Sequence, residues 1–97
     1  MASSRLLNLA KQALSIVSTA TAKDNEINMW IDSAIADMER AGINARDNTD
    51  NGLIESAIIM YVRGNYGSTD PKEKELSMMS YKLHVGELAL SDEYRKV

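Results

Sequence analysis

The sequence predicts an all-α protein, a small bundle of about four helices with a flexible C-terminal segment. Helix breakers are scarce, because the 97 residues include only five glycines and one proline. The apolar set is dominated by alanine, leucine, isoleucine and methionine, which are mostly good helix formers, and phenylalanine is absent. Four segments repeat apolar side chains at a helical period. The length predicts a single domain over residues 1–97, with a core formed by about residues 5–90.

The first two helices are expected over residues 4–20 and 25–41. Residues 16–21 are β-branched and polar, so the first helix should fray or end about there. Asp24 is a good N-cap for the second helix, and Gly42 is a natural residue to follow its end. Helical spacing predicts that the first two helices contribute these core side chains: Leu14, Ile27, Trp30, Ile31, Ile35 and Met38.

The third helix is expected over residues 52–66, after a turn-rich stretch in which Asp50 or Asn51 can serve as the cap. One face should join the core through Ile54, Ala57, Ile58 and Tyr61. Ile59 and Met60 make the opposite side partly apolar as well. A helix that is apolar nearly all round is either central in its fold or covered by another subunit.

The fourth helix is expected over residues 71–90. Asp70 supplies a cap, Pro71 occupies the first helical position, and an acid follows at the third. Leu76, Met79, Leu83 and Leu90 recur at about seven-residue spacing, which suits packing of one helix edge against a neighbour. Residues 91–97 are mostly charged and are expected to form a tail that is mobile in the free subunit.

No motif in the chain indicates catalysis. Cysteine is absent, and the single histidine, His84, has no metal-binding pattern around it. We therefore expect no enzymatic activity, no metal and no cofactor. Neither a secretory signal nor a membrane-spanning stretch is evident. The net charge is −3, and the acidic excess lies in residues 47–97, which argues against binding to DNA phosphates.

Residues 53–67, with the sequence LIESAIIMYVRGNYG, carry a resemblance to a known family. The pattern resembles the phage head–tail connector (neck adaptor) proteins. It consists of an apolar helix, then Tyr-Val-basic-x-Asn-aromatic-Gly, a short acidic turn and a helix with Ser-Tyr before its end. The Leu-Leu-x-Leu run of residues 6–9 and the capped helix after Asp24 fit the same pattern, so the resemblance spans roughly residues 5–90. Residues 15–23 depart from it, since they are unusually rich in serine and threonine.

The resemblance implies a structural subunit of a ring, often dodecameric, at the head–tail interface of the virion. Its implied partners are further copies of itself, the portal protein and a downstream neck or tail protein. The protein would be made in the host cytoplasm, and DNA would pass through the ring without specific binding. Residues after about Leu83 would contact the portal. We expect the subunit and portal interfaces to use Ile59, Met60, Arg63, Tyr66, Leu76, Met79, Leu83, Leu88, Leu90 and Tyr94.

Two other functions compete with this interpretation. Residues 25–41 and 52–66 could be drawn as a helix-turn-helix DNA-binding regulator. Against this, their joining loop is long, and Arg63 is the only cation in the second of these helices. A helical chaperone or scaffold would use the same amphipathic surfaces, so the sequence does not separate it from a connector.

Overall fold

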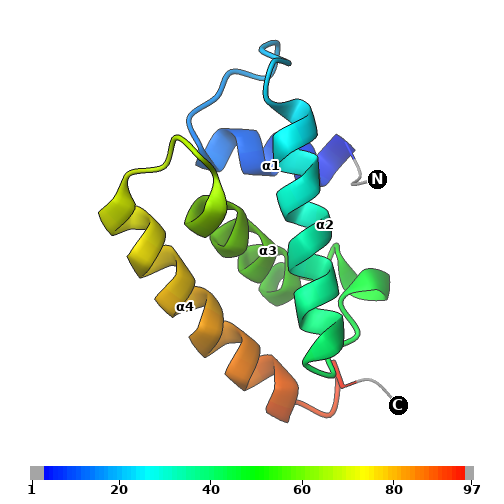
Figure 1. Cartoon of the computed structure of the whole chain (residues 1–97). Coiled ribbons are helices and arrows are strands. Elements are labelled where there is room, and N and C mark those ends of the chain that lie inside the picture. Colours follow the sequence, from blue (N-terminus) through cyan, green and yellow to red (C-terminus); the bar gives the residue numbers. More distant parts are fainter. Residues whose placement is uncertain (1–3, 96–97) are drawn as a thin grey trace.

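Four α-helices and one short 3₁₀ helix make up the fold of the computed structural model, which describes residues 4–95. The order is α1 (Ser4–Ala13), α2 (Asp24–Arg40), η1 (Arg46–Asn48), α3 (Gly52–Asn65) and α4 (Pro71–Leu90). Helix α3 is central, since it packs against α1, α2 and α4. Helices α3 and α4 run antiparallel, side by side, and α2 crosses α3 (Figure 1). The predicted all-α class and its four helices are confirmed.

Helix α1 is shorter than the expected residues 4–20, because it ends at Ala13. Ser15 has a positive φ of 60°, which breaks the helical path, and the backbone N–H of Ile16 bonds back to the carbonyl of Lys11. The expected end in the β-branched run was therefore placed too late. Residues 16–23 form a loop.

Helix α2 begins at Asp24, but the Asp24 side chain does not cap it. Its carboxylate instead pairs with the ammonium of Lys11, at 2.8 Å. Lys11 is 2% exposed, and its Nζ also donates to the carbonyl of Ser18. One buried lysine thus ties α1, the following loop and α2 together. The predicted role of Asp24 as N-cap is corrected to that of an ion-pair partner.

The later helix boundaries follow the local sequence. Asn51 caps α3, with its side-chain oxygen accepting from the backbone N–H groups of Leu53 and Ile54. Asp70 caps α4 in the same way, and Pro71 occupies the first helical position. Gly42 follows α2 with a φ of +86°, a conformation that favours glycine. These three boundaries confirm the caps and terminator expected from the sequence.

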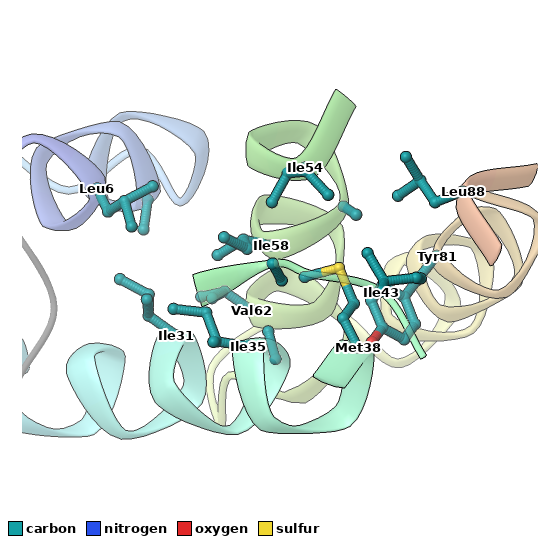
Figure 2. Close-up of a cluster of buried hydrophobic side chains, with 14 of the residues drawn as sticks. Leu6, Ile31, Ile35, Met38, Ile43, Ile54, Ile58, Val62, Tyr81 and Leu88 are labelled. Atoms are coloured by element: carbon teal, nitrogen blue, oxygen red, sulfur yellow. The ribbon is translucent and has the colours of Figure 1, made fainter. Parts of the chain in front are cut away.

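The core gathers side chains from all four helices and from the loop after α2. Leu6 from α1, Ile31 and Ile35 from α2, and Ile58 and Val62 from α3 meet near its middle (Figure 2). Toward the other end, Met38, Ile43, Tyr81 and Leu88 close the space between α2, α3 and α4. Of the expected core residues, Ile27, Ile31, Ile35, Met38, Ile54, Ala57 and Ile58 are buried, and Leu14, Trp30 and Tyr61 are partly buried against them.

The chain after α4 packs against the body as far as it is described. Tyr94 is buried, its carbonyl accepts from the backbone N–H of Asn44 at 2.7 Å, and its hydroxyl accepts from the Asn51 side chain at 2.8 Å. Ile43 and Arg95 form an isolated antiparallel bridge. The expected loose tail is therefore anchored up to Arg95, and its last two residues lie outside the described part.

Candidate interaction surfaces

An exposed apolar stripe runs along the outer face of α4. Leu76, Met79, Leu83 and Leu90 are 53%, 56%, 70% and 80% exposed, respectively. Monomeric proteins expose single apolar side chains routinely, but a row of four on one helix is unusual. The seven-residue spacing seen in the sequence thus describes a free surface of the protomer. We call these four residues the α4 stripe.

The opposite face of α4 holds the helix on the protein. Tyr81 and Leu88 are buried there, and Met78 and Val85 pack partly buried beside them. At about 100° per residue, this inner row lies roughly opposite the α4 stripe. Close packing at the inner row involves Gly64 of α3, where an added Cβ would lie 2.5 Å from Met78 side-chain atoms. Because α4 is apolar on both sides, it joins the fold through one and leaves the other uncovered.

A groove between α1 and α3 forms a second apolar surface. Its volume is about 480 Å³, and its lining consists of Leu9, Gln12, Ala13, Glu55, Ser56, Ile59, Met60 and Arg63. Ile59 and Met60 are half-buried in its wall. The Glu55 end carries an ion pair with Arg5, and the other end carries Arg63, whose guanidinium lies 3.6 Å from the carboxylate of Glu73. We call this the α1–α3 groove.

Three residues expected at an interface belong to the fold instead. Tyr66, Leu88 and Tyr94 are at most 8% exposed. Tyr66 follows α3 and turns inward where the chain reverses toward α4, and Leu88 lies on the inner row of α4. Tyr94 fills the space next to Asn51. These three are corrected to core residues, because their covering surfaces come from the same protomer.

The other residues expected at an interface form two groups. Leu76, Met79, Leu83 and Leu90 are the α4 stripe, which lies roughly opposite the inner row of α4. Ile59, Met60 and Arg63 line the α1–α3 groove. Met60 and Arg63 also line a smaller hollow of about 270 Å³ between α3 and α4, together with Leu76. The structure therefore brings these interface residues into two surfaces, which adjoin at this hollow.

A polar cluster between α2 and α4 was not expected from the sequence. The hydroxyl of Tyr81 donates to Asp37 at 2.6 Å, and Arg40 donates to the other oxygen of the same carboxylate at 2.8 Å. Burial, followed by the hydrogen bond to Asp37, raises the pKa of Tyr81 far above its ordinary value. Burial and the nearby Asp37 charge also raise the pKa of Tyr61, whose ring meets that of Tyr81 edge-on at 5.0 Å. The cluster fixes α4 against α2.

Within residues 4–95, no cluster of side chains has the arrangement of a catalytic or metal-binding site. The Nδ1 of His84 lies 3.0 Å from the carbonyl of Ser80 in its own helix. No group of three or more acidic, histidine or cysteine side chains in the described part is placed to hold a metal ion. None of the helices in that part combines the length and apolarity needed to cross a membrane.

The helix-turn-helix alternative fits poorly with the position of α3. A recognition helix must protrude so that its side chains can enter a DNA groove. Helix α3 is instead packed against all three other helices, and its two charged side chains, Glu55 and Arg63, both form ion pairs within the protomer.

Comparison with known proteins identifies a family. The family model described as Phage connector protein matches residues 6–95, which is nearly the whole chain. Neither the curated proteins nor the solved structures that were searched include a match to this chain.

Proposed function

This chain belongs to the phage connector protein family, and we propose that it is a ring-forming subunit. The ring docks under the portal, extends the DNA channel and joins head to tail. Membership of this family implies that the protein is a structural part of the virion. We propose in addition that it forms a ring, that the ring lies beneath the portal and that it binds a tail-side partner. The helix-turn-helix alternative is not favoured by the family match.

The uncovered α4 stripe is the observation that carries the proposal. Four large apolar side chains at 53–80% exposure are costly to keep in water, at roughly 25 cal/mol per Å² of apolar surface. An assembly that covers them removes that cost. A ring of identical subunits also needs two different surfaces on each subunit, because its contacts are head-to-tail. The α4 stripe and the α1–α3 groove are two such surfaces.

The charge distribution is compatible with DNA moving through a ring. Duplex binding depends on lysine and arginine contacts to phosphates, and each such contact would slow a moving duplex. Residues 47–97 carry nine acidic and six basic side chains, so this half offers no cationic stripe. We expect negligible duplex binding at physiological salt; micromolar binding in an anisotropy titration would contradict this expectation.

The proposal is tested by adding the purified chain to portal rings of the same phage and measuring the mass of the complex. We expect a ring of subunits on the portal, and loss of that complex with Leu83→Glu. Ala36→Glu is the matched control, since Ala36 is exposed on α2, away from both surfaces. Thermal unfolding should show that Leu83→Glu remains folded. Failure of the unaltered chain to bind the portal would refute the proposed role.

A further inference from the structure

We propose that neighbouring subunits join by seating the α4 stripe of one copy in the α1–α3 groove of the next. The α4 of the incoming copy lies antiparallel to α3, with Glu75 facing Arg63 and Glu87 facing Arg5. This inference rests on the proposed ring function and specifies the surfaces that would form the ring contact. The occupant of the groove is thus a second copy of this chain.

The spacing of the α4 stripe indicates that its partner is helical. Leu76, Leu83 and Leu90 are seven residues apart, and Met79 and Gly86 fall three residues after the first two leucines. This is the a and d pattern of a helix that packs along another helix. Gly86 has open space around it, so a partner backbone can approach closely there.

The α1–α3 groove offers a matching receptor. It is a concave surface between two helices, with Ile59 and Met60 in its wall and Leu9 and Ala13 on its rim. Small or flexible apolar side chains accommodate a ridge of leucines by ridge-into-groove packing. Its charged residues, Glu55 and Arg63, lie at its two ends, so the middle can accept an apolar ridge without burying a charge.

The two surfaces are different parts of the protomer, as a head-to-tail contact requires, and they adjoin at the hollow that Met60, Arg63 and Leu76 line. On α3, Glu55 and Ile59 meet α1, whereas Tyr61 and Gly64 meet α4. At about 100° per residue, these two pairs are roughly 180° apart around the helix. Most of the α4 stripe therefore lies beyond α4, whereas the groove lies on the α1 side of α3. A contact between two different surfaces propagates from copy to copy and does not close as a dimer.

Ring symmetry sets the direction of the incoming helix. In a ring of about six or more subunits, each neighbour is rotated by roughly 60° or less. The incoming α4 therefore points within about 60° of the direction of the resident α4, which runs antiparallel to α3 (Figure 1). With Leu83 placed against Ile59, the residues preceding Leu83 point toward Arg63, and the residues following it point toward Glu55 and Arg5.

That orientation brings opposite charges together at both ends of the groove. Glu75 and Glu87 are exposed on the margins of the α4 stripe, and neither forms an ion pair with another residue of the range 4–95. At a rise of about 1.5 Å per residue, Glu75 and Glu87 are about 18 Å apart along α4. Glu55, which holds Arg5 by an ion pair, is about 12 Å from Arg63 along α3. Long arginine side chains span the difference, and a guanidinium can serve two carboxylates at once.

Packing one α4 stripe against another is less favourable in the antiparallel arrangement. It would place Lys82 next to its own copy and Glu73 next to Glu87, so like charges would meet along the seam. It would also leave the α1–α3 groove uncovered. A stripe-to-stripe dimer is therefore an alternative outcome that the experiment must detect.

Thiol cross-linking tests the contact, because the chain contains no cysteine. Ser56→Cys places a thiol in the groove and Glu87→Cys places one beside the stripe; Ala36→Cys on α2 is the matched control. The variants are treated with a short bifunctional maleimide, alone and on portal rings. We expect a mixture of the Ser56→Cys and Glu87→Cys chains to yield covalent dimers well above a mixture of the Ala36→Cys and Glu87→Cys chains. The double variant should yield a ladder of higher oligomers.

Two results would overturn the inference. Cross-linking of Glu87→Cys with itself at the yield of the mixed pair would indicate stripe-to-stripe packing. A mixed-pair yield no higher than the control, both in solution and on the portal, would exclude the groove. Portal binding measured in the same samples separates these failures from failure of the proposed function. A charge swap adds specificity, since Glu75→Arg and Arg63→Glu should each lower the yield and together restore it.

Discussion

Two leucines five residues apart on α4 should respond oppositely to truncation. Leu88 is 3% exposed on the inner row, whereas Leu83 is 70% exposed on the α4 stripe. We predict that Leu88→Ala destabilises the isolated subunit strongly and that Leu83→Ala leaves its stability nearly unchanged. The chemical change is the same in both variants, so only the position of the side chain differs.

The magnitude for Leu88 comes from lost burial and from the cavity left behind. Truncation of a buried leucine to alanine costs about 2–5 kcal/mol. Leu88 borders a hollow of about 230 Å³ that Leu53 and Tyr94 also line, so neighbouring side chains can relax into the space and the cost should lie near 2–3 kcal/mol. For a domain of this size, that corresponds to a fall in Tm of roughly 10–20 °C. Leu83→Ala should change stability by about 0.5 kcal/mol or less.

Thermal and urea unfolding followed by circular dichroism at low protein concentration would measure both effects. Low concentration matters because self-association would lend Leu83 an apparent contribution to stability. Equal losses of stability in the two variants would refute the assignment of an inner and an outer face to α4. A large loss confined to Leu83→Ala would reverse the assignment and remove the free surface on which the proposed ring depends.

Two further predictions concern the polar contacts between helices. Tyr81→Phe should cost about 1.5 kcal/mol at neutral pH, because it removes a hydrogen bond to the charged Asp37, and urea midpoints would measure this. The folded state raises the pKa of Tyr81, so the contribution of its hydroxyl to folding stability is complete below the unfolded pKa of 10 and is lost as pH rises above it. The fall in stability at alkaline pH should therefore be shallower in Tyr81→Phe than in the unaltered chain. An identical dependence of stability on pH in the two chains would contradict this. Lys11→Met should cost about 1–3 kcal/mol, because it retains most of the packing but leaves the carboxylate of Asp24 without its partner; an unchanged urea midpoint would show that this ion pair contributes nothing.

Local sequence predicted the parts of the fold that depend on neighbouring residues. A cap needs a suitable side chain within three residues of the first free N–H groups, so Asn51 and Asp70 could be identified without knowledge of the fold. The stripe of α2 from Ile27 to Met38 was equally readable, because helical spacing alone brings its members to one face.

The errors arose where a distant segment competes for a side chain. Aspartate commonly caps helices, yet the carboxylate of Asp24 pairs with the ammonium of Lys11. Lys11 itself gave no sign of burial, since a lysine is almost never fully buried without a partner and that partner lies thirteen residues away. Tyr94 was assigned to a mobile tail because its neighbours are charged, although the loop after α2 and Asn51 hold it in place.

The sequence by itself determined which residues of α4 share a face, because a helix has a fixed period. The helical period places Leu76 and Leu83 in one row and Tyr81 and Leu88 in another, although only the first row was recognised from the sequence. Only the tertiary structure decided which row is covered, because α4 can pack either row against α3. The inner row is selected by the close approach at Gly64 and by the hydrogen bond from Tyr81 to Asp37. Burial is a property of the surrounding surfaces, and no spacing within one helix contains it.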